Sequence, residues 1–253
     1  MNANLRGNSR RVLPAPHLPT SLDARRGPLR SRHPSMLPAS SVDFYGRNFI
    51  VSPDVLIPRP ETEMMVDAVL SLCGKAYLPG VKPSKAKLPQ NCLILDVGTG
   101  SGCVAVSLAL ELPKALVMAS DVSDSALRVA RDNASKLGAE IEFVKSDLMN
   151  NVKGDFDVVV ANLPYVDENW EWIDKKELSK EPAIALYAED GGLALIKRLI
   201  DQVSERKIPY LILEADPCQH ERIINYTNNH DYSLLETRGF ILIFTRGRLL
   251  TGR

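Results

Sequence analysis

The sequence predicts an α/β protein with a doubly wound, mostly parallel sheet of seven strands. Apolar, β-branched runs alternate along the chain with segments of helical apolar spacing, as expected for parallel strands joined by helical crossovers. The run over residues 156–161 is apolar at nearly every position, which is typical of a central strand covered on both faces. Only Arg238-Gly239 separates the last two runs, so these two runs predict an antiparallel hairpin at the carboxyl end.

The expected elements follow from these patterns in chain order. The strands are expected over residues 92–97, 115–121, 140–144, 156–161, 209–214, 232–237 and 240–245. The helices are expected over residues 62–73, 102–111, 124–137, 192–205 and 217–229. Residues 44–51 predict a short hairpin that turns at Gly46, and residues 74–90 predict a loop.

The amino-terminal part differs in composition from the rest of the chain. Residues 1–43 contain seven Arg, no Lys, six Pro and little apolar periodicity, which predicts a disordered extension. An organellar transit peptide is the alternative, because the segment is rich in Arg and poor in acidic residues. Residues 44–253 are expected to form one domain that begins with the hairpin segment 44–60. That domain carries 24 basic and 29 acidic residues, a net charge of −5.

Composition and residue spacing exclude several classes of protein. Four cysteines and four histidines are scattered without ligand spacing, so we expect neither a metal site nor a disulfide framework. Free cysteines fit a reducing compartment, and we expect the protein in the cytoplasm. Every long apolar run is interrupted by charges or prolines, so no membrane partner is expected. An acidic domain suits a small ligand or a basic protein partner better than nucleic acid.

A glycine-rich turn follows the first strand of the predicted sheet. The sequence Gly98-Thr99-Gly100-Ser101-Gly102 lies between that strand and a helix, where glycines permit close approach of a ligand to free backbone N–H groups. NAD, FAD and S-adenosylmethionine would all suit such a loop. A tight turn with a purely structural role is the alternative.

Two acidic positions follow the next two strands. Asp121 lies 19 residues after Gly102, where a carboxylate can accept hydrogen bonds from both ribose hydroxyls of a nucleotide. A helix cap or a solvated strand end is the alternative for Asp121. Asp147-Leu148 follows the third strand and is placed to border an adenine ring, with an ordinary loop acid as the alternative.

The central strand ends in Asn162-Leu163-Pro164-Tyr165. Pro164 cannot donate to a sheet ladder, so the strand must stop there. This leaves the Asn162 carboxamide and free backbone carbonyls at the carboxyl edge of the sheet, where open α/β sheets bind ligands. A simple strand-ending turn is the alternative.

Taken together, these motifs resemble those of class I methyltransferases that act on amino groups. Residues 49–63 (Phe-Ile-Val-Ser-Pro-Asp-Val-Leu-Ile-Pro-Arg-Pro-Glu-Thr-Glu) closely resemble the signature of the HemK/PrmC family, the glutamine methyltransferases of peptide chain release factors. Downstream residues also match that family: Glu181-Pro182, Ala185-Leu186, Gly192-Leu193, Leu213-Glu214, Gln219 and Arg246-Gly247-Arg248. The resemblance covers roughly residues 44–248.

The resemblance implies transfer of a methyl group from S-adenosylmethionine to the side-chain amide nitrogen of a release-factor glutamine. Asn162 and the Leu163 carbonyl would accept the two amide N–H groups, and Tyr165 would line the pocket beside Pro164. The residues implied in cofactor binding are Gly98, Thr99, Gly100, Ser101, Gly102, Asp121, Asp147, Leu148 and Asn162. Residues 58–63 are expected to pack over the cofactor. Nucleic acid would be met only indirectly, through the ribosome.

Two departures from the family pattern leave alternatives open. The usual motif is Asn-Pro-Pro-Tyr, whereas Leu163 here gives the form typical of rRNA adenine dimethylases. Methylation of adenine N6 in RNA or DNA is therefore the second hypothesis, and a non-catalytic binding module is the third. Family members usually carry a helical amino-terminal domain that helps to dock the release factor, and only the Arg/Pro-rich segment precedes the signature here.

Overall fold

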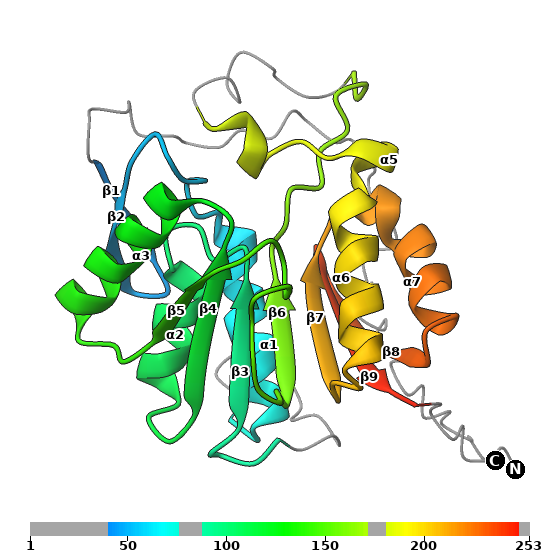
Figure 1. Ribbon diagram of the computed structural model, residues 1–253, viewed down its shortest axis with the longest axis horizontal. Coiled ribbons are helices and arrows are strands. Elements are labelled where there is room, and N and C mark those ends of the chain that lie inside the picture. Colours follow the sequence, from blue (N-terminus) through cyan, green and yellow to red (C-terminus); the bar gives the residue numbers. More distant parts are fainter. Residues whose placement is uncertain (1–39, 76–87, 172–180, 248–253) are drawn as a thin grey trace, which may run out of the picture.

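The computed structural model describes residues 40–75, 88–171 and 181–247 (Figure 1). A seven-stranded sheet runs through the molecule in the order β5-β4-β3-β6-β7-β9-β8. The strands are β3 (Leu93–Val97), β4 (Leu116–Asp121), β5 (Glu142–Lys145), β6 (Val158–Ala161), β7 (Tyr210–Glu214), β8 (Tyr232–Arg238) and β9 (Ile241–Arg246). Strand β9 is antiparallel to both of its neighbours, and the other paired strands are parallel. The predicted mostly parallel sheet with a carboxyl-terminal hairpin is confirmed.

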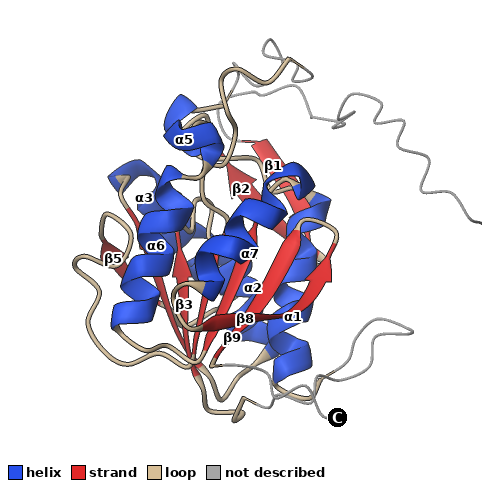
Figure 2. Cartoon of the chain, turned by 90° about the vertical axis from the view of Figure 1, so that its right-hand side faces the viewer, coloured by secondary structure: helices blue, strands red, loops and turns tan. Residues whose placement is uncertain are grey.

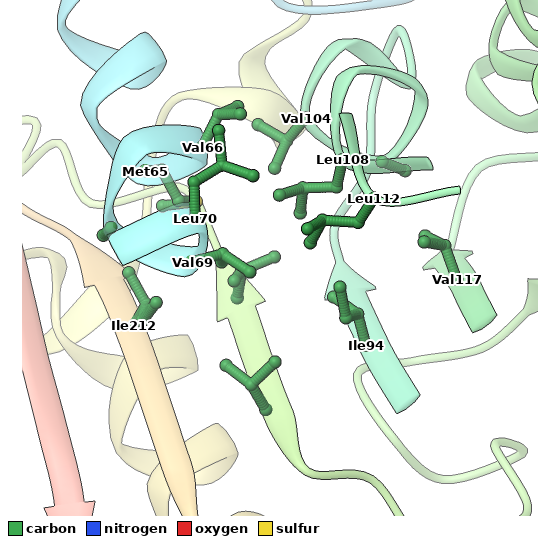
Figure 3. Close-up of a cluster of buried hydrophobic side chains, with 14 of the residues drawn as sticks. Met65, Val66, Val69, Leu70, Ile94, Val104, Leu108, Leu112, Val117 and Ile212 are labelled. Carbon is green, nitrogen blue, oxygen red and sulfur yellow. The ribbon is translucent and has the colours of Figure 1, made fainter. Parts of the chain in front are cut away.

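Helices cover both faces of this sheet (Figures 1 and 2). The helices are α1 (Glu63–Leu72), α2 (Cys103–Glu111), α3 (Asp124–Leu137), α6 (Ala194–Glu205) and α7 (His220–Asn228). One apolar cluster joins α1 and α2 to the sheet, and the second joins α6 and α7 to the opposite face. Figure 3 shows the first cluster, in which α1 with Val69 lies over the sheet near Ile212, and Leu112, directly after α2, lies near Ile94.

The central strands supply side chains to both clusters in alternation. Ile94 of β3 belongs to the α1–α2 side and the next residue, Leu95, to the α6–α7 side. Strand β6 begins at Val158, two residues after the expected start of the run over residues 156–161. Every residue of β6 is buried, which confirms a central strand covered on both faces. The two cores hold β3 and β6 rigidly side by side, and it is between these two strands that the chain order of the sheet reverses.

A small hairpin precedes the sheet and packs on α3. It is formed by β1 (Ser40–Phe44) and β2 (Arg47–Val51) and turns at Gly46, as predicted. The strand begins at Ser40, four residues before the expected start of the hairpin. The Asn133 side chain on α3 donates to the Ile50 carbonyl at 2.9 Å and accepts from the Ile50 amide at 2.7 Å, which fixes the hairpin against the helix.

Two expected helices begin two and three residues later than the pattern suggested, whereas α1 and α2 begin one residue later. Helix α6 starts at Ala194 because Asp190 and Gly191, in the short α5 (Glu189–Gly192), have left-handed backbone angles. The helix expected over residues 217–229 is a 3-10 turn, Pro217–Gln219, followed by α7. No helix in the described part of the chain is long and apolar enough to cross a membrane. Most of the expected extension 1–43 and of the loop 74–90 lies outside the described residues.

Candidate active site at the carboxyl edge of the sheet

A cavity of about 280 Å³ opens at the carboxyl ends of the parallel strands. Its walls come from the segments that follow β3, β4, β5 and β6, together with the segment before α1. It lies beside the point where the strand order reverses, which is the usual ligand position in open α/β sheets. Residues singled out from the sequence that line it are Gly98, Thr99, Gly100, Ser101, Asp121, Asp147, Leu148, Asn162, Leu163 and Pro164.

The glycine turn after β3 needs glycine for steric reasons. Gly98, Gly100 and Gly102 all have positive φ angles, of 73°, 56° and 79°. A Cβ on Gly98 would lie 2.9 Å from Leu163 Cδ2, and one on Gly102 would lie 3.0 Å from Ala130 Cβ of α3. The turn is therefore packed directly against the Asn-Leu-Pro-Tyr motif on one side and against α3 on the other.

Asp121 holds this turn in place. Its Oδ2 accepts from the Gly100 amide and its Oδ1 accepts from the Ser123 amide, both at 2.9 Å. Ser123 itself caps α3, because its hydroxyl accepts from the Ala126 amide. Burial raises the pKa of Asp121. The carboxylate both organises the loop and lines the cavity, so the structural and ligand-binding interpretations of Asp121 are compatible.

A further carboxylate in the cavity wall, that of Asp96, was not predicted from the sequence. Asp96 is the fourth residue of β3, and its Oδ2 accepts from the Thr99 hydroxyl at 2.6 Å. Burial raises the pKa of Asp96 to about 7. The available signal was an acidic residue within the otherwise apolar strand Leu-Ile-Leu-Asp-Val. A buried acid at the edge of a cavity is suited to face positive charge on a ligand.

The segment after β5 contributes a different kind of wall. Asp147 is about half exposed and forms an ion pair with Arg198 at 2.6 Å. Leu148 is buried with a φ of 51°, and its carbonyl accepts from the Ser120 hydroxyl at 3.4 Å. Leu148 therefore offers a fixed apolar surface, whereas the Asp147 carboxylate has a partner on α6.

The Asn-Leu-Pro-Tyr motif divides between the cavity and the interior behind it. Asn162, Leu163 and Pro164 line the cavity, and Tyr165 is not among the lining residues. The Tyr165 hydroxyl instead donates to Glu214 Oε1 at 3.3 Å. The amide nitrogen of Asn162 donates to the Thr62 hydroxyl at 3.1 Å. Leu163 is 4% exposed, and its side chain lies against Gly98.

Residues that matched the family pattern without a stated role now have one. Gln219 Nε2 donates to the carbonyls of Tyr165 and Gly191, each at 2.8 Å. A Cβ on Gly192 would lie 1.9 Å from the Tyr165 carbonyl oxygen, so only glycine permits this approach. Together, Gln219 and Gly192 fix the backbone at Tyr165, directly after the residues that line the cavity.

The proline-bracketed segment before α1 is held by Glu181. The carboxylate of Glu181 accepts from Arg59 at 2.5 Å and from the Ile57 amide at 3.1 Å, and its side chain is almost completely buried. Thr62, in the same segment, contacts Asn162. This segment therefore forms part of the cavity wall through Thr62 and Pro58. In the described part of the chain no group of three or more His, Cys, Asp or Glu side chains could hold a metal ion.

Comparisons with known proteins agree with this geometry. Residues 84–198 match the family described as the methyltransferase small domain. The chain is 41% identical over 196 residues to a release factor glutamine methyltransferase of Koribacter versatilis, covering 74% of this chain and 65% of the relative. It is 41% identical over 177 residues to one from Neisseria gonorrhoeae, covering 68% and 59%.

Solved structures share the fold at low sequence identity. A T. thermophilus 16S rRNA N2 G1207 methyltransferase in complex with AdoMet and guanosine aligns with a TM-score of 0.59 at 15% identity, covering 85% of this chain and 52% of that one. A methyltransferase from Pyrococcus furiosus aligns with a TM-score of 0.56 at 18% identity, covering 81% and 91%.

The sheet order and the cavity at its reversal point define a class I methyltransferase fold. Within that class, the chain is 39–41% identical to relatives named release factor glutamine methyltransferases. It spans about three fifths of the length of the curated relatives it matches.

Proposed function

We propose that the protein binds S-adenosylmethionine and transfers its methyl group to the side-chain amide nitrogen of a glutamine in a peptide chain release factor. One observation carries the proposal: the glycine turn and the Asn-Leu-Pro-Tyr motif meet in one cavity, with Leu163 packed on Gly98. A methyl donor held by the first and an amide held by the second would therefore be neighbours. The names of the relatives support this reaction and this class of substrate.

The residues present fit S-adenosylmethionine, which supplies an electrophilic methyl group on a sulfonium. Backbone groups of residues 98–102 offer close approach without side-chain obstruction. Asp121 is placed to accept from the ribose hydroxyls, and Leu148 to border the adenine ring, with Asp147 beside it. Asp96 adds a buried carboxylate that suits the positive charges of this ligand.

Asn162 and Leu163 position the acceptor nitrogen. An amide nitrogen is a poor nucleophile because its lone pair is delocalised into the carbonyl, so placement is the main requirement. The Asn162 oxygen and the Leu163 carbonyl accept the two N–H bonds of the substrate amide, direct the nitrogen to the methyl group and stabilise the positive charge that develops on it. The methylated nitrogen becomes acidic and loses its proton late, so no dedicated general base is required.

Pro164, in the cavity wall, and Tyr165, behind it, support this arrangement. Pro164 ends strand pairing and leaves the carbonyls free. The Tyr165 hydroxyl donates to Glu214, and the Tyr165 carbonyl accepts from Gln219. The backbone after Leu163 is therefore held through both the side chain and the main chain of Tyr165. A fixed carbonyl is what an orienting acceptor requires.

Labelled S-adenosylmethionine with purified release factor, and with rRNA in parallel, tests the proposal. We expect label in the release factor and its loss when the acceptor glutamine is replaced. Label in rRNA and none in the release factor would support N6 methylation of adenine instead, the function favoured by Leu163 in place of the usual proline. A release-factor substrate places the reaction in the cytoplasm, or in an organelle if residues 1–40 serve as a transit peptide.

A further inference from the structure

The proposed role of Asn162 depends on which end of its carboxamide faces the cavity. The two ends of the group are nearly equal in size but opposite in hydrogen bonding, because the oxygen only accepts and the nitrogen only donates. Methyl transfer to an amide nitrogen requires the oxygen at the cavity. A group of the protein, and not the substrate, must therefore distinguish the two orientations.

The partner that distinguishes them is Thr62. Asn162 Nδ2 donates to Thr62 Oγ1 at 3.1 Å, across 100 residues of chain. Thr62 precedes α1 at the N-cap position, where a threonine hydroxyl commonly accepts from the helix backbone. Here Thr62 makes no side-chain capping hydrogen bond, and its backbone is already helical. The residue is 2% exposed, and its hydroxyl is used toward Asn162 and not for the helix.

Behind Thr62 lies Glu214, the last residue of β7. Glu214 is 2% exposed, and its Oε1 accepts from the Tyr165 hydroxyl. Hydrogen bonding by Thr62 and Asn162 lowers the pKa of this carboxylate, as the Tyr165 hydroxyl does. Its Oε2 is buried without a hydrogen-bond partner within the described residues. A buried, incompletely paired carboxylate is unfavourable for stability, so a strand end with only a structural role would be better served by an apolar residue.

We infer that Glu214 and Thr62 are positioning residues for the methyl transfer proposed above, on which this inference rests. The Glu214 carboxylate accepts the single Thr62 hydroxyl proton, so the Thr62 oxygen can only accept, and it accepts from Asn162 Nδ2. The Asn162 oxygen is then left at the cavity. In the reversed orientation the Asn162 oxygen would face the Thr62 oxygen with no proton between them.

The charge state of Glu214 decides whether the hydrogen bonds that join Asn162, Thr62 and Glu214 can all donate toward the carboxylate and in no other direction. Burial raises the pKa of Glu214 to about 7, hydrogen bonds from Thr62 and Tyr165 oppose the rise, and the charge of Glu61 adds to it. When Glu214 is protonated, it can donate to Thr62, which frees the Thr62 proton for a reversed Asn162. The other titratable groups that face this site are Glu61, Tyr165, Cys103, Asp216 and Arg59.

Replacement of Thr62 by valine tests the inference, with serine as the matched control. Thr62→Val keeps the size of the side chain and removes the hydroxyl, whereas Thr62→Ser keeps the hydroxyl. We expect the single-turnover rate of Thr62→Val to fall by about 10- to 100-fold, with unchanged S-adenosylmethionine affinity in calorimetry. Thr62→Ser should keep most of the rate. A Thr62→Val protein with the wild-type rate would overturn the inference.

Glu214→Gln tests the direction of the hydrogen-bond chain. The wild-type rate should fall toward acid pH as Glu214 is protonated. The Glu214→Gln rate should be lower at neutral pH and should lack this acid limb, because a carboxamide both donates and accepts and does not titrate. An unchanged acid limb in Glu214→Gln would contradict a role for this carboxylate.

A measurement without substrate separates this inference from the proposed function. The side-chain amide protons of Asn162, assigned in ¹⁵N spectra by their loss in Asn162→Ala, should be shifted and slow to exchange in the wild type. Both properties should be lost in Thr62→Val and kept in Thr62→Ser. This result supports the orientation even where the release factor is not methylated, whereas fast exchange in the wild type refutes it whatever the activity.

Discussion

The two walls of the cavity are built in different ways. The cofactor wall, the side proposed to bind S-adenosylmethionine, is made mainly from the backbone of the glycine turn, where Gly98 and Gly100 line the cavity. It also contains Asp121, whose carboxylate accepts from a loop amide 21 residues away. The acceptor wall is made from side chains held by distant partners. The Asn162 side chain is held by Thr62 across 100 residues, and the Glu181 side chain holds the Ile57 backbone amide, in the segment before α1, across 124. The cofactor wall should therefore tolerate side-chain changes around it, whereas the acceptor wall depends on single long-range contacts.

The largest expected effect is at Gly192. Gly192→Ala puts a Cβ 1.9 Å from the Tyr165 carbonyl oxygen, on a residue whose φ is +80°. The backbone after Leu163 would have to move, and we expect the free energy of unfolding to fall by about 4 kcal/mol or more, a size that marks severe core substitutions. Urea denaturation measures it.

Gly138 offers a matched control for Gly192. It has a φ of +75°, and a Cβ added there would meet nothing within 4 Å. Gly138→Ala should therefore lower the free energy of unfolding by about 1 kcal/mol, through backbone strain alone. Equal losses at both glycines would show that the contact with Tyr165 is not the reason for the cost.

The difference between the walls also explains what the sequence could predict. The succession of strands and helices along the chain, the glycine turn and Asp121 could be predicted from local patterns. Periodicity and turn chemistry act over a few residues. Asp96 carries a local signal too, a charge in an apolar strand, although that signal alone does not point to a cavity. The partnership of Thr62 with Asn162, and of Gln219 with the Tyr165 carbonyl, joins segments that only the folded sheet brings together. The family signature marked these residues without giving their contacts.

The second effect concerns the acceptor wall alone. Asn162→Ala removes one of the two proposed acceptors, which should raise the barrier for methyl transfer by about 3–4 kcal/mol, while affinity for S-adenosylmethionine stays largely intact. Single-turnover rates and calorimetry measure the two separately. Asn48→Ala, on the exposed part of the hairpin, is a suitable control. Near-normal turnover of Asn162→Ala would show that the motif does not orient the amide.

Two buried carboxyls near the cavity, Asp96 in the cofactor wall and Glu214 behind Thr62, should make stability depend on pH. Burial raises the pKa of Asp96 and of Glu214 to about 7. Between about pH 4 and 7, these two carboxyls therefore keep their protons in the folded state and have lost them in the unfolded state. The stability that these protons provide is complete below the unfolded pKa values and is lost as pH rises through about 7.

The size and source of this pH dependence can be measured by denaturation. The free energy of unfolding of the ligand-free protein should fall by a few kcal/mol between about pH 4 and 8, an upper estimate for two buried groups. Asp96→Asn and Glu214→Gln should each flatten the curve. Asp190→Asn should leave the fall in place, because the pKa of the exposed Asp190 is lowered by Lys197 and not raised by burial. A rise in stability over this range would contradict the assignment.

The cofactor wall is probed by Asp121. Asp121→Ala should weaken binding of S-adenosylmethionine by about 1.5–3 kcal/mol, as for hydrogen bonds to a charged group. It also removes the acceptor for the Gly100 amide, so some of the loss comes from the loop. Asp121→Asn keeps a neutral oxygen that can accept from Gly100, and should lose less. Calorimetry compares the two, with NAD as the competing ligand, for which no binding is expected.

The smallest expected effect is at Leu163, where the two walls touch. Leu163→Pro restores the residue usual in the family and keeps the backbone carbonyl, which is the only group the proposed reaction uses. The Leu163 side chain is nearly buried against Gly98. Its replacement by proline should therefore lower the free energy of unfolding by about 1–2 kcal/mol, less than a Leu→Ala substitution in a core, because the proline ring keeps part of the apolar contact. Glutamine methylation should persist at a similar single-turnover rate, and Leu163→Ala measures the packing loss without a new proline. If Leu163→Pro abolished methylation of the release factor while Leu163→Ala did not, the backbone at this position would be tuned for another acceptor, and an adenine amino group would be the one to test.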